Sequence, residues 1–337
     1  MEVFVMFEEY ANHEVAVYGG YLNDHTKLLQ SASGGIATAM SEYMIEQGGW
    51  VAGVAYRDDF YGAEYLLTKL SSDLNRLKGS KYIECDKKSI YADVKNLISS
   101  GERVLFFGLP CTVAALYKFI GERPENLLTC ELICHGPTSS QVHRDYVTHL
   151  ENKYKSKVID FSVRRKKGAW MPGYLYAKFE NGEIFEKPFY ETEYGYGFSI
   201  FGKESCYHCQ FKGNNRQADI MIGDFWGATE SDEYWNKNGV SVMFAETKKG
   251  DAFLNQIPNI TLFSTTFEKA VKNNQMVIKS KAKKPNRDKF AKLLSKKDLI
   301  YAVKHSSSPK MRIKKFISNA IPKKIKSKIK NTFRAHK

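Results

Sequence analysis

The sequence has few of the features that exported or membrane-spanning proteins carry. Its longest apolar stretch, Val104 to Tyr117, is interrupted by Gly108 and Pro110, and it falls short of the roughly 20 apolar residues that cross a bilayer. The first ten residues include three glutamates and have neither a basic start nor a small-residue cleavage site, so no secretory signal is expected. We therefore expect a cytoplasmic protein without a transmembrane helix.

Cysteine is scarce, with six residues in a chain of 337. This number is too small for a disulfide scaffold, and a reducing compartment leaves such thiols available for metals or redox chemistry. With 43% hydrophobic and 13% aromatic residues, the chain can bury a large core without covalent crosslinks. The placement of the cysteines is therefore the main clue to function.

Acidic residues are absent from residues 301–337, which contain twelve lysines or arginines. Twelve of the fourteen net positive charges thus belong to this tail, which leaves +2 on the first 300 residues. A basic groove for nucleic acid has little support in the rest of the chain, so no nucleic-acid partner is expected.

Apolar residues recur every four positions within the basic tail, at Ile313, Ile317, Ile321, Ile325, Ile329 and Phe333. This spacing predicts a basic amphipathic helix that is broken near Pro322. Such a helix can lie on an anionic membrane surface, which would make the protein peripheral at the inner face of the membrane. A disordered basic tail is the alternative interpretation.

The chain alternates predicted helices and strands up to about residue 165. These elements are expected at 36–47 (helix, with Ser33 as N-cap), 50–56 and 64–70 (strands), 90–99 (helix), 104–108 (strand), 110–120 (helix), 127–134 (strand), 141–154 (helix) and 158–163 (strand). Beyond them, strands are expected at 175–179, 184–187, 218–222 and 240–247, and helices at 252–256 and 267–273.

This order predicts an α/β fold: a mixed sheet core with parallel βα units, then a more β-rich α+β portion, then a basic helical tail. We divide the chain into an α/β half at 1–165, a β-rich half at 166–278, and a basic linker and tail at 279–337. Beyond Lys279 the sequence is rich in lysine and is expected to be loose.

Four cysteines stand at the ends of predicted elements. Cys206 and Cys209 form a Cys-x-x-Cys pair, whose spacing lets two thiolates reach one metal ion or cluster. Cys111 follows Pro110 at a helix start, where free N–H groups and the helix dipole favour a thiolate. Cys134 ends a strand.

Three interpretations of these thiols are open. A [4Fe–4S] cluster needs four sulfur ligands, which matches the set. Structural zinc usually uses two close pairs of ligands, whereas only one pair is close here, so the spacing favours the cluster over zinc. The thiols could also be unliganded. Cys85 and Cys130 are expected to be ordinary buried thiols.

Seven short motifs follow one another between about Ser31 and about Gln275. They are Ser33-Gly34-Gly35, Gly79-Ser80-Lys81-Tyr82, Gly108-Leu109-Pro110-Cys111, Cys134-His135-Gly136, Lys166-Lys167-Gly168-Ala169-Trp170, Ser205-Cys206-Tyr207-His208-Cys209 and Gly223-Asp224-Phe225-Trp226-Gly227. With these motifs in this order, the chain resembles the coenzyme F420 hydrogenase/dehydrogenase beta-subunit family, particularly its C-terminal domain.

The resemblance implies an iron–sulfur flavoprotein oxidoreductase that passes electrons between a [4Fe–4S] cluster, FAD and a soluble acceptor, with coenzyme F420 as one candidate. It implies that Cys111, Cys134, Cys206 and Cys209 are the cluster ligands. Relatives are also found among genes for surface-polysaccharide synthesis, which gives polysaccharide biosynthesis as a candidate context. The chain departs from the family at Leu109, where threonine is usual, and at Thr112, where glutamine is usual.

Many members of this family begin with a ferredoxin-like segment of repeated Cys-x-x-Cys spacing, and this sequence has no such pattern near its start. The expected partners are therefore an electron-donor or acceptor protein, such as a ferredoxin-like carrier, and a small-molecule substrate.

Two motifs predict contacts to cofactor phosphates. Ser33, Gly34 and Gly35 precede a predicted helix, and glycines let backbone N–H groups approach an anion at a helix start. Ser80, Lys81 and Tyr82 could add a cation and an aromatic face. An ordinary helix cap and a solvated loop are the alternatives.

Further along the chain, Arg164 and Lys166 belong to a basic run that could bind an anionic coenzyme tail, although such runs are commonly just solvated. Trp226 could pack on a flavin. His135 and Asp224 are the candidate catalytic residues: His135 to relay protons, and Asp224 to hydrogen-bond a flavin or substrate edge. A structural histidine and a turn aspartate are the alternatives.

Two rival functions are compatible with the same residues. One is a non-catalytic adaptor stapled by zinc, whose tail binds the membrane surface. The other is a flavin-free iron–sulfur protein that only transfers electrons. Metal and flavin content distinguish both rivals from the flavoprotein.

Overall fold

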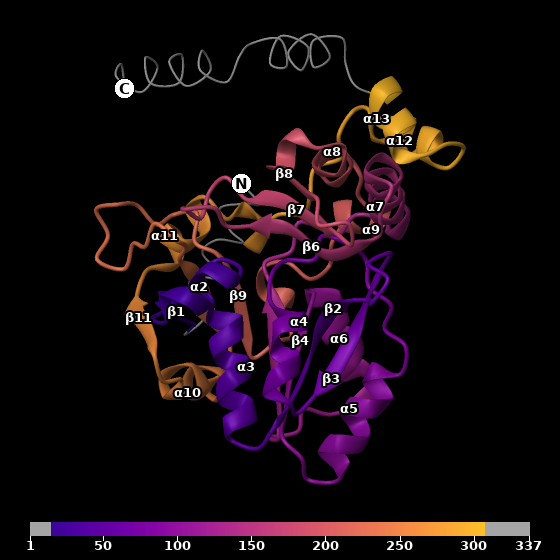
Figure 1. Ribbon diagram of the computed structural model, residues 1–337. Helices are drawn as coiled ribbons and strands as arrows, with labels where there is room; N and C mark the ends of the chain where they lie inside the picture. Colours follow the sequence, from indigo (N-terminus) through magenta and orange to yellow (C-terminus); the bar gives the residue numbers. More distant parts are fainter. Residues whose placement is uncertain (1–14, 307–337) are drawn as a thin grey trace.

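Two β-sheets organise the chain (Figure 1). The computed structural model describes residues 15–306. The larger sheet has eight strands in the order β11-β1-β10-β9-β5-β4-β2-β3, and the smaller sheet has the order β6-β7-β8. The strands are β1 Ala16–Leu22, β2 Trp50–Tyr56, β3 Ala63–Thr68, β4 Val104–Gly108, β5 Leu127–Leu132, β6 Val158–Arg165, β7 Tyr174–Phe179, β8 Ile184–Pro188, β9 Ile220–Asp224, β10 Ser241–Ala245 and β11 Ile260–Ser264.

Helices alternate with these strands along most of the described chain. They are α2 His25–Gln30, α3 Ile36–Glu46, α4 Leu74–Leu77, α5 Ile90–Ser99, α6 Pro110–Ile120, α7 Ser140–Tyr154, α8 Glu193–Ile200, α9 Glu204–Tyr207, α10 Lys248–Gln256, α11 Phe267–Lys272, α12 Arg287–Leu294 and α13 Leu299–Ser306.

The centre of the larger sheet is parallel. Strands β2, β4, β5 and β9 pair in parallel, whereas β3, β10, β1 and β11 are added antiparallel at the two sides. The β4 sequence Val-Leu-Phe-Phe-Gly is apolar throughout because both faces of a central parallel strand are covered. The predicted α/β class with parallel βα units is confirmed.

Helices cover both faces of this sheet. On one face, α3 and α10 pack on residues such as Leu105 and Ile222. On the other face, α5 and α6 pack on Phe106, and α11 packs farther along the sheet. Helix α5 buries Ile90, Val94 and Ile98, a spacing of four that places them on one side of the helix.

The smaller sheet has a core of its own, built with α7, α8, α12 and α13. Figure 1 shows α12 and α13 beside α7 and α8, at the end of the molecule that carries β6, β7 and β8. The expectation of a loose chain beyond Lys279 is wrong for residues 287–306, because Phe290 and Leu299 are fully buried there. Apolar residues at helical spacing outweigh the surrounding lysines.

The element bounds differ from the predicted ones mainly at their ends. Helix α3 begins after Gly35, which is its N-cap with φ +78°, so the prediction of Ser33 as the N-cap is wrong. Strands β1 and β11 and helix α8 were not predicted. The three-segment division of the chain stays a prediction; β6 and β7, which pair, lie on opposite sides of its first boundary.

The predicted amphipathic helix, from Ile313 to Phe333, lies outside the described residues. Within residues 15–306, no helix is long and apolar enough to cross a membrane.

Candidate functional site

The predicted site residues follow strands that end at one edge of the larger sheet. Cys111 comes after β4, Cys134 after β5 and Asp224 at the end of β9, and these three strands are parallel neighbours. Ser33 follows β1, which runs in the same direction as β9 because both are antiparallel to β10. Side chains at the carboxyl ends of parallel strands are a common place for ligand sites in open α/β sheets.

Three chain segments bring the four predicted cysteine ligands into one neighbourhood. Cys111 lies in the first turn of α6, and Cys134 lies just beyond β5. Cys206 lies in the short helix α9, and Cys209 follows it. Electrostatic interactions join Cys111 to Cys206 and Cys209, and join Cys134 to Cys111 and Cys206. None of the four forms a disulfide.

Gly136 lies between two of these cysteines. Its backbone N–H donates to Cys134 Sγ at 3.2 Å. A Cβ atom at this position would lie 3.3 Å from Cys206 Sγ, and φ is +81°, a conformation that favours glycine. The glycine of the Cys134-His135-Gly136 motif thus lets the two cysteine segments approach each other.

For two thiols of this set, Cys134 and Cys111, desolvation by the surrounding protein disfavours the thiolate form. It raises the pKa of Cys134 to about 11, and it raises the pKa of Cys111, with further increases from Cys209 and Cys206. Thiolates crowded together repel one another, and a bound metal removes that penalty. The donor set therefore fits a thiolate-bound metal centre.

The sulfurs are not already gathered around the position of a single ion. In the described part of the chain, no group of three or more His, Cys, Asp or Glu side chains has an arrangement that could hold a metal ion. A single zinc ion with bonds of about 2.3 Å needs its sulfurs in mutual contact. An iron–sulfur cluster is a larger body that binds four thiolates at separate corners.

Beside the cysteines, an ion pair joins the two sheets. Arg164, at the end of β6, donates through Nη1 to Asp224 Oδ2 at 2.9 Å and to the Tyr82 hydroxyl at 2.9 Å. The side chains of Arg164 and Asp224 are 11% and 18% exposed, so the pair is largely buried. Tyr82 in turn stacks on Phe198 with ring centroids 4.4 Å apart.

Two tryptophans complete this cluster. Trp170 Nε1 donates to Asp224 Oδ1 at 3.3 Å, so both carboxylate oxygens of Asp224 have protein partners. The Trp170 and Trp226 rings stack with centroids 4.8 Å apart and planes 10° apart, and the Arg164 guanidinium lies 5.7 Å from the Trp226 centroid. Trp170 was recognised in the sequence only as part of a motif, and no role was assigned to it there.

His135 directly follows Cys134 in the chain. The residue is exposed on one side, yet desolvation by the surrounding protein lowers its pKa to about 4, with further lowering from Lys212 and an opposing effect from Asp224. The ring is therefore neutral at pH 7. The charged groups that act on its ring are Lys212, Asp224, Lys281 and Arg164.

Lys166 fixes the predicted phosphate loop from the side of the smaller sheet. Its ammonium donates to the carbonyl oxygens of Leu28 and Ser33. Burial lowers the pKa of Lys166 to about 7, and Asp224 opposes this shift. The Ser33 hydroxyl donates to the Val240 carbonyl at 2.9 Å, which ties the loop to the start of β10.

The two glycine amides of this loop already donate within the protein. Gly34 N–H donates to Ser241 Oγ at 2.9 Å, and Gly35 N–H donates to the Ala32 carbonyl at 2.9 Å. A Cβ on Gly34 would collide with the Gly20 carbonyl, so the glycine is required for close packing. Their cofactor role stays a prediction, and it would depend on other groups of the loop.

Lys81 and Ser80 differ from Tyr82 in their surroundings. The Lys81 ammonium donates to four carbonyl oxygens of residues 76–79, at the end of α4, and burial lowers its pKa to about 7. Its donors are thus directed at the chain itself. Ser80 is half-buried in the same turn. Of this motif, only Tyr82 contacts the Arg164–Asp224 pair.

The two remaining cysteines, Cys85 and Cys130, agree in part with the expectation that both are buried. Cys130 is fully buried within β5, whereas Cys85 is only half-buried. Both keep raised pKa values because of burial.

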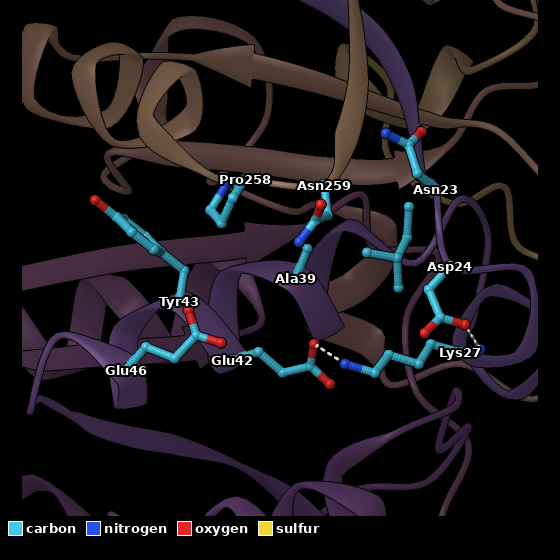
Figure 2. Close-up of a pocket in the computed structure, with 10 residues that line it drawn as sticks. Asn23, Asp24, Lys27, Ala39, Glu42, Tyr43, Glu46, Pro258 and Asn259 are labelled. Atoms are coloured by element: carbon cyan, nitrogen blue, oxygen red, sulfur yellow. Dashed lines mark hydrogen bonds and ion pairs between the residues drawn. The ribbon is translucent and has the colours of Figure 1, made fainter.

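A cavity of about 400 Å³ opens elsewhere, beside α3 (Figure 2). Asp24, Lys27, Glu42 and Tyr43 line it, and the Lys27 ammonium forms a 2.8 Å ion pair with Glu42. It contains none of the predicted site residues, and its acidic groups do not suit an anionic cofactor. The chemistry of the cysteine and arginine cluster, rather than this cavity, marks the candidate site.

The fold and the site together define a class of α/β protein in which a second, smaller sheet is attached at the carboxyl edge beside a set of four thiols. The chain belongs to the coenzyme F420 hydrogenase/dehydrogenase beta-subunit family, because the model of this family's C-terminal region matches residues 101–269. The resemblance inferred from the seven motifs is confirmed.

A solved structure has the same fold. A chain of the F420-reducing [NiFe] hydrogenase complex from Methanosarcina barkeri is similar to this protein with a TM-score of 0.53 and 18% sequence identity, over 80% of this chain and 89% of that chain. No curated protein matches the sequence. The family is one of redox-enzyme subunits, which places this chain among enzymes of the redox kind.

Proposed function

We propose that this protein is an iron–sulfur flavoprotein oxidoreductase that passes electrons between a [4Fe–4S] cluster, FAD and a soluble acceptor. One observation carries the proposal: four cysteines from three separate segments meet at the carboxyl edge of the larger sheet. Unliganded thiols have no reason to gather in this way, whereas a cluster binds four of them. Membership of a redox family supports the same conclusion.

Cys111, Cys134, Cys206 and Cys209 would hold the cluster, which when bound supplies one-electron transfer. Neighbouring residues affect how stable the thiolate forms are, and the cluster binds thiolates. The Gly136 N–H donates to Cys134 Sγ, and N–H groups directed at sulfur stabilise a thiolate. Cys111 reaches the surface, which gives a donor protein a short path to the site.

FAD would supply the coupling of one-electron to two-electron steps when bound. Arg164, Tyr82 and the two stacked tryptophans offer a cation, a hydroxyl and aromatic surface in one cluster. His135 is neutral and exposed, so one ring nitrogen carries a proton that it can donate to a bound acceptor while the other accepts a hydrogen bond from solvent. Asp224 has both oxygens engaged, so we assign it to positioning rather than to proton transfer.

The partners follow from the same proposal. The similar chain belongs to an F420-reducing hydrogenase complex, which supports an electron-donor or acceptor protein as the partner here. Coenzyme F420 is then one candidate acceptor. A cytoplasmic location and a role in polysaccharide biosynthesis complete the proposal, and peripheral contact with the membrane depends on the tail.

Anaerobic purification with joint quantification of iron, sulfide, zinc and flavin tests this function. About four irons and four sulfides per chain are expected, together with one flavin. The Cys206→Ser, Cys209→Ser double variant should lose the iron, while Cys85→Ser, at a half-buried thiol outside the set, should keep it. Zinc without iron would favour the adaptor. Iron without flavin would favour the electron-transfer protein.

A further inference from the structure

One short stretch of chain, residues 275–281, runs across the cysteine site and is held there by groups from the segment that carries Cys206 and Cys209. We call this stretch the strap. The Cys209 N–H donates to Ser280 Oγ at 3.0 Å. The Lys212 ammonium donates to the Met276 carbonyl, and Arg216 Nη2 donates to the Val277 carbonyl at 2.7 Å. The strap is thus part of the built site.

Two lysines of this region are buried or half-buried and donate to carbonyl oxygens. Lys212 is 7% exposed, and its second bond goes to the Cys134 carbonyl at 2.8 Å. Lys281, on the strap, donates to the carbonyls of Phe198 at 3.1 Å and Phe201 at 2.7 Å. Within residues 15–306, neither ammonium forms an ion pair with a carboxylate, unlike Arg216, which pairs with Glu131.

An ammonium in such surroundings needs a counter-ion, because carbonyl dipoles compensate only part of the lost hydration. The cysteines act on both lysines. Lys212 is also near Glu131 and Arg216, which pair with each other, and Lys281 is near Lys284. Electrostatic interactions join Lys212 to Cys134 and Cys209, and join Lys281 to Cys206 and Cys134. A Cβ placed on Gly136 would lie 3.3 Å from Cys206 Sγ and 3.7 Å from Lys281 Cδ, so the lysine stem and the sulfur both lie beside Gly136.

The charges of the site balance when the four cysteines hold an oxidised [4Fe–4S] cluster. Four thiolates carry four negative charges, and an oxidised [4Fe–4S] core carries two positive charges, so the centre has a net charge of two minus. Lys212 and Lys281 together provide two positive charges.

We propose that Lys212 and Lys281 are the counter-cations of the loaded four-cysteine centre and that their charge makes the centre easier to reduce. This inference rests on the proposed function. Adding an electron raises the negative charge of the centre, and a fixed positive charge nearby in a low-dielectric environment stabilises that state. Both residues are positioning residues that act through the electrostatics of the centre.

The test is the midpoint potential of the iron–sulfur centre in the full-length holoprotein, followed by absorbance and electron paramagnetic resonance during a redox titration. Lys281→Met keeps the aliphatic stem and removes the charge, and it should shift the midpoint to a more negative potential. Lys283→Met is the matched control, because Lys283 lies two residues away and pairs with Glu204 and Asp288. It should leave the midpoint unchanged.

Two further variants separate charge from structure. Lys281→Arg restores the charge and should return the midpoint to the wild-type value. Such a return would not be expected if Lys281 acted only through its bonds to the Phe198 and Phe201 carbonyls at the end of α8. Lys212→Met should shift the midpoint in the same direction as Lys281→Met. If Lys281→Met holds a full complement of iron with an unchanged midpoint, this inference is overturned while the proposed function stands. A wild-type protein with no iron or sulfide overturns both.

Discussion

The ion pair between Arg164 and Asp224 should contribute strongly to stability, because it joins the two sheets and is largely removed from water. In the Asp224→Asn variant the side-chain shape is kept, and the amide oxygen can still accept from Trp170. Arg164 would keep its bond to the Tyr82 hydroxyl but lose its only carboxylate partner among the described residues. The change therefore removes the negative charge and the acceptor that Arg164 uses, while the rest of the side chain stays in place.

The burial of the pair sets how much free energy of unfolding the variant should lose. Removing one partner of a buried pair costs about 3–5 kcal/mol, because the other charge is left uncompensated. With side chains 11% and 18% exposed, some hydration remains, so we expect a loss near the lower end, about 3 kcal/mol. The matched control is Asp58→Asn, whose carboxylate pairs with Arg76 but is 93% exposed, and it should cost less than about 1 kcal/mol.

The assay is urea unfolding followed by tryptophan fluorescence, applied to the wild type, Asp224→Asn, Arg164→Met and the double variant. The four free energies of unfolding form a double-mutant cycle, and we expect a coupling energy of about 2 kcal/mol. A coupling energy below about 1 kcal/mol, the range of an exposed ion pair, would refute the reasoning, since it would show that water screens the pair despite its burial.

Two other perturbations test separate parts of the structure. Gly136→Ala should release iron from the purified protein, because its Cβ would press on Cys206 Sγ, whereas Gly182→Ala, with a similar φ of +85° but open space around it, should keep iron and lose only about 1 kcal/mol of stability. Burial lowers the pKa of His143 to about 4, and the ring, whose Nε2 donates to the Phe60 carbonyl at 2.7 Å, is held neutral in the folded state. The unfolded chain therefore binds a proton at His143 more readily than the folded chain does. The contribution of neutral His143 to the free energy of unfolding, about 3 kcal/mol, is complete above pH 6.5 and is lost as the pH falls toward 4. Unfolding free energies measured across that range should fall less steeply for His143→Gln than for the wild type, and parallel slopes would contradict the assignment.

The sequence predicted best those elements whose pattern is local. Strand β2, helix α5, strand β4 and helix α6 have the predicted bounds, because each combines an apolar run or a helical spacing with a clear glycine or proline at or near its end. Helices α12 and α13 were missed, since their lysines resemble those of the tail and only the packing of Phe290 on the smaller sheet reveals them. Net charge was a misleading guide there.

The site residues also divide into those that local spacing in the sequence identifies and those that only the fold reveals. The cysteines and the glycine of Cys134-His135-Gly136 were recognisable as types of residue at known spacing, and the structure brings them together. No spacing could predict that Lys81 is directed at the end of α4 or that Trp170 stacks on Trp226, since these contacts join residues from different elements. Lys212 and Lys281 could not be told apart from the rest of the 51 lysines and arginines, and only their surroundings in the fold distinguish them.

The arrangement also explains why the cysteine loops and the smaller sheet occur in one protein. Arg164 and Lys166 extend from the end of β6 to Asp224 and to the Ser33 loop, so the smaller sheet positions groups that follow two strands of the larger one. The strap leads from the cysteines directly into α12, which packs on the smaller sheet. A change that loosens either attachment should therefore disturb the thiols and the aromatic cluster together, even though no covalent bond links the two groups. Under the proposed function, the rate of electron transfer would fall as the two bound cofactors moved apart, so a rigid connection between these two groups would serve that function.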